Sequence, residues 1–262
     1  MKLRLPRFGD NAARWINDFI SILGRQEFVD PQEFQRVSDK ADTNEADIAT
    51  VELQIPGTYR RLLYTSNDTW TKPVGLSFAR VTVVGGGAGS GYVTTTDGAA
   101  SAGGGAGGWT EKVIAESLLS ETESVVVGAG GTAGLYATTT AAGAGGTSSF
   151  GSHCSATGGS PSSARTTATI AIGGSGGLGA SGDIIGCGGR GWPSVPSTSG
   201  GDGGASLFGA GGIGGGTSGG GATSKGSGGG GSHRTSGTDR NGVAGASGIV
   251  IVEEFYNVSL LS

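Results

Sequence analysis

Hydrophobic residues near the start of the chain recur at the spacing of a helix. Asp10 precedes the first of them and Gly24 follows the last, and these residue types commonly begin and end helices. Intervals of three and four residues place one apolar face along this segment, formed by Trp15, Ile16, Phe19, Ile20 and Leu23. The pattern predicts an amphipathic helix.

A second helical segment follows and carries a heptad pattern. Asp30, Pro31 and Glu33 form a helix start, with the aspartate as cap and the proline in the first turn. The positions that follow at alternating steps of three and four are Phe34, Val37, Ala41, Asn44, Ile48 and Val51. This seam is typical of a coiled coil whose register Asn44 fixes, but an amphipathic helix packed on its own domain has the same pattern. We expect residues 1–56 to form a helical region for oligomerisation and attachment.

From residue 57 the pattern becomes that of β-structure. Short runs of β-branched and aromatic residues are separated by turn residues such as Asn67-Asp68. Strands are predicted for residues 61–64, 69–71, 78–84, 109–114, 124–127, 147–150, 166–172 and 248–256. These runs flank and interrupt a glycine-rich stretch, so residues 57–262 are interpreted as a second domain.

Glycine dominates this second domain. Only Gly9, Gly24, Gly57 and Gly75 of the 57 glycines precede residue 85. In steps of three from residue 173 to residue 230, every position except Ile185 is glycine or serine. The bulky residues, such as Trp192 and Phe208, fall in the other two phases. A random Gly/Ser linker would not sort side chains by phase, although such a linker is the usual reading of this composition.

A three-residue period belongs to the left-handed polyproline II helix, which makes no hydrogen bonds within itself. Chains that carry only hydrogen as a side chain can approach closely enough to bond sideways. We therefore expect a mainly β fold with a bundle of polyglycine II helices, besides the N-terminal α-helical region. Ordering each glycine costs roughly 0.5 to 1 kcal/mol more than ordering alanine, so the bundle must form cooperatively. A disordered tract is the alternative.

Charge and composition narrow the partners and the chemistry. A net charge of -4 without a basic cluster disfavours nucleic acid and anionic lipid, and no apolar run is long enough to insert in a membrane. Cys154 and Cys187 lack the spacing of a zinc site with His153 and His233. These cysteines are read as free or buried thiols, with one disulfide as the alternative. We expect no metal and no cofactor.

Two glycine motifs imitate a dinucleotide fingerprint. They are VVGGGAGSG, which ends at residue 91, and VVVGAGGTAG, which ends at residue 134. A real fingerprint is followed by a helix and by an acidic residue about 20 positions later. Neither motif has them, and GGSGG at residues 173–177 matches a nucleophile elbow only as any Gly/Ser tract does. No catalytic residue is assigned, and we expect that the chain is not an enzyme.

The order of motifs resembles a known family. The motifs are YTSNDTWTKPVGLSFARVTVVGGGAGSG, GGWTEKV, VVVGAGG, GGTSSFG with SATGG, and GASGIVIVEEF, over residues 64–256. Together they resemble the glycine-rich domain of tailed-bacteriophage tail fibres. The resemblance implies a virion protein made in the host cytoplasm, with polyglycine II helices similar in kind to those of the tip adhesins of T-even-type tail fibres. In those adhesins the loops between the helices touch the receptor.

Receptor-binding residues are expected where side chains other than glycine gather. The candidates are Arg190, Trp192, Pro193, Val195, Pro196, Phe208, His233, Arg234 and Tyr136. Asp239 and Arg240 belong to the same candidate loop as His233 and Arg234. Trp192 and Phe208 could instead seal the sides of the bundle, and His233 and Arg234 could belong to a solvated turn.

Two functions remain open at this stage. One is a receptor-binding adhesin that reads a bacterial surface glycan or an outer-membrane protein. The other is a structural spacer of the tail or baseplate that never contacts the host. In both, the partners include baseplate or tail-fibre proteins, and a homo-oligomer is expected, with a trimer favoured.

Overall fold

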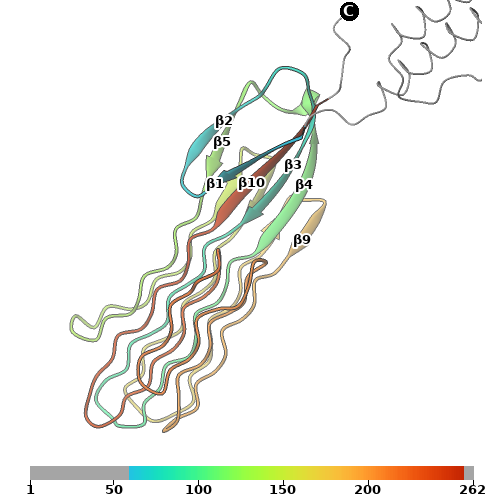
Figure 1. Ribbon diagram of the computed structural model, residues 1–262. Helices are drawn as coiled ribbons and strands as arrows, with labels where there is room; N and C mark the ends of the chain where they lie inside the picture. Colours follow the sequence, from blue (N-terminus) through green and yellow to red (C-terminus); the bar gives the residue numbers. More distant parts are fainter. Residues whose placement is uncertain (1–58, 257–262) are drawn as a thin grey trace, which may run out of the picture. The chain divides into compact units, whose positions relative to one another are not determined.

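The strands of the protein form two antiparallel sheets (Figure 1). The first has the order β1 (Tyr59–Tyr64), β10 (Ile249–Tyr256), β3 (Leu76–Val84), β4 (Trp109–Ala115) and β9 (Ile184–Gly186). The second has the order β2 (Asp68–Thr71), β5 (Thr122–Val126), β6 (Ser148–Phe150), β7 (Cys154–Ala156) and β8 (Gly179–Ala180). One 3-10 turn, η1 (Glu116–Leu118), follows β4.

The structure is a computed structural model that describes residues 59–256. The predicted helices of residues 1–56, with their heptad seam, lie outside the described residues. Within the described part, the prediction of a mainly β fold is confirmed. No helix there is long and apolar enough to cross a membrane.

One predicted strand, residues 166–172, is wrong. Arg165 donates its amide to Tyr92 O at 2.9 Å, and the amide of Ala171 bonds to Ser194 Oγ at 2.9 Å. The two ends of this run therefore bond to different neighbours, and no strand lies along its whole length. The β-branched threonines and isoleucines of this run are typical of a strand, but residues 165–170 form a loop.

A core of apolar side chains lies between the two sheets. Val81 and Val83 of β3 are fully buried, because alternate residues of the strand point to the same face. Trp70 of the second sheet meets Phe150 edge-on, with ring centroids 5.6 Å apart. The other core residues include Ile114, Val125, Val250 and Val252.

Two adjacent glutamates of β10 are held by charged and polar partners. Glu254 is buried, accepts a hydrogen bond from Trp70 Nε1 at 2.8 Å and pairs with Arg60 at 2.6 Å. Glu253 pairs with Arg80 at 2.6 Å and with Arg61 at 2.8 Å. Burial alone would raise the pKa of Glu253, but the hydrogen bonds from Arg80, Tyr59 and Arg61 outweigh it and lower the pKa to about 2.

We expect these contacts to make stability depend on acid. The folded-state pKa of Glu253 is lowered from its ordinary 4.5 to about 2. The stabilisation is therefore complete above pH 4.5 and is lost as the pH falls toward 2, by about 2–3 kcal/mol. Urea unfolding at several pH values should show this slope in the wild type. The Glu253→Gln variant should be less stable at pH 7 and should lose this part of the slope, and an unchanged slope would contradict the assignment.

Between the strands the chain forms extended segments that are neither helix nor strand. In Figure 1 they run away from the sheets and turn back at a far end. Residues 85 and 88 donate backbone hydrogen bonds to segment 99–108, residues 86 and 89 to segment 141–147, and residues 87 and 90 to segment 240–248, all at 2.8–3.0 Å. Successive amides thus point to three different neighbours, and the pattern repeats every three residues.

Three of these segments, 85–93, 99–108 and 227–233, lie at the centre of the bonded network, and we call them the inner segments. Their glycines, alanines and serines are all buried. Segment 85–93 donates to three neighbours and accepts from three others, through Gly131, Gly159 and Gly229. The inner segments can be surrounded on all sides because their side chains are so small.

The remaining segments form a ring around the inner ones. These outer segments are 128–134, 141–147, 157–164, 171–178, 187–194, 200–205, 210–216, 219–223 and 240–248. Each outer segment from 128–134 to 219–223 bonds to the next, for example from Gly145 to Gly159 O at 3.0 Å and from Gly191 to Gly174 O at 2.9 Å, and segment 240–248 bonds to 128–134. Bulky residues such as Trp192 and Ile213 occur here, pointing to solvent. We refer to inner and outer segments together as the lattice.

Candidate functional site

Loops at the end of the lattice farthest from the sheets meet one another. These distal loops are residues 94–98, 135–140, 165–170, 195–199, 216–218 and 234–239. Thr94 donates its amide to Arg165 O at 3.0 Å, and Gly98 donates to Arg234 O at 3.0 Å. Ser197 donates to Gly98 O at 2.9 Å. Loops more than 100 residues apart in sequence are therefore joined by main-chain bonds.

Several distal loops turn through the left-handed backbone region without glycine. Thr139, Ser197 and Ser236 have φ of 51°, 59° and 51°. L-residues other than glycine, asparagine and aspartate rarely adopt this conformation. The short bridges Leu135↔Thr140 and Val195↔Ser199 close two of these turns. These loops therefore bend tightly at small hydroxyl residues.

Arg234 holds two of the loops, 94–98 and 234–239, together. It pairs with Asp97 and, through Nε, with Asp239 Oδ1 at 2.6 Å, and its own side chain is only 12% exposed. Asp97 also accepts the amide of Gly237 at 2.9 Å. The hydrogen bond from Arg234 lowers the pKa of Asp239. Arg234 therefore supports the loops through its two carboxylate partners.

Arg165 and Arg240 have a different environment. Each lies beside Val93, in a parallel and an antiparallel bridge respectively. Among residues 59–256, neither guanidinium makes an ion pair within 4.0 Å, and the buried Nε atom of each has no hydrogen-bond partner. These two arginines supply positive charge to the distal end that no carboxylate of the described chain neutralises.

Two tyrosines adjoin these arginines. The carbonyl of Tyr92 accepts the amide of Arg165, and the amide of Tyr136 donates to Asn241 Oδ1 at 3.0 Å. Asn241 directly follows Arg240. The distal end thus combines aromatic rings, two free cations and a carboxamide on neighbouring backbone segments. We call Tyr92, Tyr136, Arg165, Arg240 and Asn241 the distal cluster.

The candidate residues from the sequence fall in several places. Tyr136, Val195, Pro196 and Arg234 belong to distal loops. Trp192, which is 67% exposed, and Pro193 lie on an outer segment just before one of them, and Arg190 lies farther back on that segment with Nε bonded to Gly173 O at 3.3 Å. The structure does not bring all of these residues together.

Phe208 and His233 are separated from the distal surface in different ways. Phe208 lies in the turn 206–209, at the end of the lattice next to the sheets. Ser206 of this turn and Val84 of β3 are close together, because a Cβ added at Gly226 would lie within 4 Å of both. His233 is 4% exposed, and its Nδ1 lies 3.0 Å from Gly216 O. The buried His233 side chain therefore supports loop 216–218 through its contact with Gly216.

Sequence reasoning included Arg240 in the candidate loop 232–240 but missed Tyr92, Arg165 and Asn241. Each is an isolated residue beside a run of threonine, serine or glycine, so no local motif marks it. A usable signal was available, because each lies within two residues of a point where a glycine-rich segment gives way to a Thr/Ser-rich run or the reverse. Such points mark the ends of lattice segments, where side chains have room.

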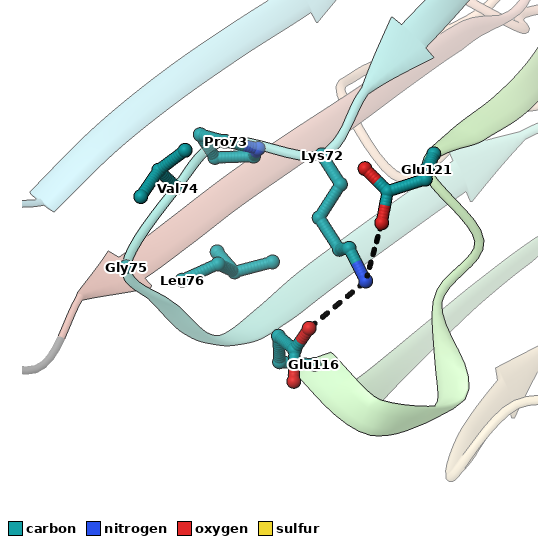
Figure 2. Close-up of a pocket in the computed structure, with 7 residues that line it drawn as sticks. All are labelled: Lys72, Pro73, Val74, Gly75, Leu76, Glu116 and Glu121. Carbon is teal, nitrogen blue, oxygen red and sulfur yellow. Dashed lines mark hydrogen bonds and ion pairs between the residues drawn. The ribbon is translucent and has the colours of Figure 1, made fainter.

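A small pocket lies at the opposite end of the sheets (Figure 2). It has a volume of about 200 Å³ and is lined by Lys72, Pro73, Val74, Gly75, Leu76, Glu116 and Glu121. Lys72 Nζ pairs with Glu116 at 2.9 Å and with Glu121 at 3.4 Å. The hydrogen bond to Glu116 raises the pKa of Lys72. A charged, fully paired lysine is a poor nucleophile or base, so the pocket offers no evident chemistry.

The cysteines are free, as the sequence favoured. Cys154 is buried and Cys187 is exposed. Burial raises the pKa of Cys154 to about 11. Within the described residues, no group of histidine, cysteine, aspartate and glutamate side chains is arranged to hold a metal ion.

Comparison with known proteins agrees with the extent of this fold. Residues 64–254 match the family model described as a glycine-rich domain. The match begins in β1 and ends in β10, so it spans both sheets and the whole lattice. No curated protein matches the chain. On this match over most of its length, the chain belongs to the glycine-rich domain family.

Proposed function

We propose that the lattice segments are polyglycine II helices and that the chain is a fibre or fibre-tip component of a bacteriophage tail. In this proposal the distal loops bind a receptor on the bacterial surface. The observation that carries the proposal is the gathering of loops from distant parts of the sequence at one end of a main-chain-bonded lattice.

The polyglycine II assignment rests on the bonding pattern. Amides three residues apart bond to the same neighbour, and amides one residue apart bond to different neighbours. A helix with three residues per turn and no internal hydrogen bonds has this property. The inner segments also tolerate almost no side chain, as expected where chains pack on every side.

A lattice of this kind suits the mounting of binding loops. Main-chain bonds to several neighbours hold each segment in place without a large apolar core, and the loops inherit fixed positions. Varying the loops leaves the buried glycine positions untouched. A host-recognition protein needs this separation, because its receptor contacts must change while its fold persists.

The distal cluster favours a polar, partly anionic receptor. Arginine presents a planar fork of donors that matches carboxylate and phosphate groups, and Arg165 and Arg240 have no ion-pair partner among the described residues. Tyr92 and Tyr136 add rings that can pack on sugars or on side chains. A bacterial surface glycan or an outer-membrane protein has these features, and both remain proposed partners.

The second candidate function is a structural spacer of the tail or baseplate. The rigidity of the lattice favours it equally, and the N-terminal region would then supply the attachment to other tail proteins and the proposed trimer. A spacer needs no free arginines at its distal end, which is why the adhesin is preferred.

Binding of the purified full-length chain to bacterial cells tests the proposal. A fluorescently labelled chain should bind cells of a susceptible strain within a panel, and it should block infection by the phage that carries it. Changing Arg165 and Arg240 to serine should weaken binding about tenfold or more, because a few anchor residues, often arginines, carry most of the binding energy of an interface.

Lys225→Ser provides the control. Its Nζ bonds to Ser247 Oγ at 3.0 Å on the lattice near the sheets, so the change removes a cation away from the distal loops. Binding should be unchanged in this variant, and the melting temperature should be unchanged in all of them. Absence of binding across the panel would favour the spacer. An equal loss of cell binding in Lys225→Ser would show that the distal loops do not bind the receptor.

A further inference from the structure

The exposed apolar side chains of the lattice gather on one side of it. They project from the outer segments 171–178, 187–194 and 210–216, which with segment 200–205 follow one another around the lattice, from the turn 206–209 and from the adjoining edge strand β9. We call this side the lateral face. Its largest contributions come from Ile172, Leu178, Ile185, Trp192, Phe208 and Ile213, which are 46–74% exposed.

Main-chain bonds bring these residues into register across the segments. Gly191 donates to Gly174 O at 2.9 Å, Trp192 to Asp202 O at 2.7 Å, and Gly203 to Gly212 O at 2.7 Å. Ile172, Trp192 and Ile213 are each within two residues of these bonds. They therefore lie at about the same level, as a row across the lateral face in which the exposed Asp202 of segment 200–205 stands between Trp192 and Ile213.

The other sides of the lattice differ. Segments 128–134, 141–147 and 240–248 present small side chains such as Ala129, Ala144 and Ala244. Outside the lateral face, the exposed large hydrophobic residues of the lattice in residues 59–256 are Leu135, Tyr136, Ile170 and Val195, all in distal loops. A lattice needs small residues only on its inner positions, so the asymmetry between outer faces has another cause.

We propose that the lateral face packs against the lateral face of a second copy of this chain. Soluble monomers rarely expose apolar patches larger than a few hundred Å². At on the order of 100 Å² for each side chain, the six residues named above offer roughly 600 Å², and a standard interface takes about 800 Å² from each partner. The area fits a protein partner of similar size.

The charges on the lateral face favour a second copy as that partner. Arg190 and Asp202 are both exposed and lie on neighbouring segments. Consider a two-fold axis that runs along the lateral face, parallel to segments 187–194 and 200–205 and between them. Such an axis brings Arg190 of each copy toward Asp202 of the other copy. A self-complementary patch of this kind is what a symmetric dimer contact requires. The same axis keeps the distal loops of both copies pointing in one direction.

The exposed thiol of Cys187 reports on this contact. Cys187 lies at the start of segment 187–194, whereas Cys154 is buried and its pKa is raised to about 11, which leaves it unreactive at neutral pH. In the full-length protein, the rate of maleimide reaction at Cys187 should fall on the order of tenfold as protein concentration rises through the dimerisation range. Sedimentation should show association over the same range.

Ile213→Asp should keep Cys187 reactive at every concentration. Ile213 is 74% exposed, so the new charge should destabilise the contact between copies without destabilising the fold. Ala244→Asp, which adds the same charge on another side of the lattice, should behave as the wild type. Trp192→Ser is a second test of the lateral face and should act like Ile213→Asp, with unchanged circular dichroism in all three variants.

Three results would overturn the inference. Reaction rates that are equal in the wild type and Ile213→Asp at all concentrations would show that nothing covers the lateral face. Protection in a chain that sediments as a monomer would show that another segment of the same chain covers it. Protection only after bacterial cells are added would assign the lateral face to the receptor. The variants of Arg165 and Arg240 should not alter Cys187 protection, so this inference and the proposed function fail separately.

Discussion

Replacing Gly105 by alanine is expected to destabilise the protein severely. Gly105 lies in inner segment 99–108, and an added Cβ would come within 2.0 Å of Ser175 O and 2.5 Å of Ser175 C. These are backbone atoms of a bonded neighbour, so they cannot rotate away as a side chain would. The segments must separate, which also lengthens the hydrogen bonds from Gly105 to Ser160 O and from Ala88 to Gly105 O.

The expected loss is about 3 kcal/mol or more, at the upper end of the cost of overpacking. For a chain of this size this corresponds to a fall in melting temperature of roughly 6–12 °C. Thermal unfolding followed by circular dichroism measures it. If the variant does not accumulate as folded protein, that outcome also agrees with the expectation.

Gly221→Ala is the matched control. No heavy atom lies within 4 Å of the Cβ that would be added at Gly221 on an outer segment. Alanine restricts the unfolded chain more than glycine does, so this variant should be unchanged or stabilised by up to about 1 kcal/mol. If both glycines tolerated alanine equally, the close packing of the inner segments would be wrong.

The sequence revealed the lattice through the spacing of its side chains, and the physical reason is now visible. Positions in one phase from residue 173 must be small where they face a neighbouring backbone. Gly173 faces Gly191 O and Gly203 faces Gly228 O, each at 2.0 Å or less from an added Cβ. Residues of the other two phases, such as Trp192 and Ile213, can point outward. The three-residue period of the sequence therefore indicates which side chains point outward from the lattice, as the hydrophobic period does in a helix or a strand.

The distinction between inner and outer segments was harder to obtain from the sequence. Segments 85–93 and 227–233 are joined by bonds from Gly229 to Ala88 O, although about 140 residues separate them. A one-dimensional pattern does not say which segments become central. A partial signal exists, since the runs GGGAGSG and SAGGGAGG contain only glycine, alanine and serine in all three phases.

The same limit explains the candidate site. Trp192 and Phe208 stand out by residue type, but neither lies in a distal loop. The fold places Trp192 on the lateral face and Phe208 in the turn 206–209 near the sheets. Arg165 is ordinary in sequence and Arg240 stood out only as part of the loop 232–240, and the fold brings both beside Val93. Which loops share the distal end depends on whether each segment runs away from the sheets or back, and therefore on the count of segments before it.

Hydrogen exchange rates should differ sharply between the inner segments and the distal loops of the glycine-rich region. Amides of the inner segments, such as those of Gly104 and Gly229, bond to other segments at 2.9 and 3.0 Å and are buried. They can exchange only when several segments separate together, which costs nearly the whole free energy of unfolding. Amides of the distal loop 135–140 are exposed and need only local opening.

We therefore expect inner amides to exchange at least about 10⁴-fold more slowly than distal-loop amides, since a difference near 5.5 kcal/mol in opening free energy gives that ratio. Mass spectrometry of peptides from the exchanged full-length chain measures it, with peptides of β3 and β10 as the slow reference. If residues 173–231 and the inner segments exchanged as fast as the loops, the chain would be a flexible linker between strands. A linker could not hold the distal loops at fixed positions, so the proposed binding role would lose its physical basis.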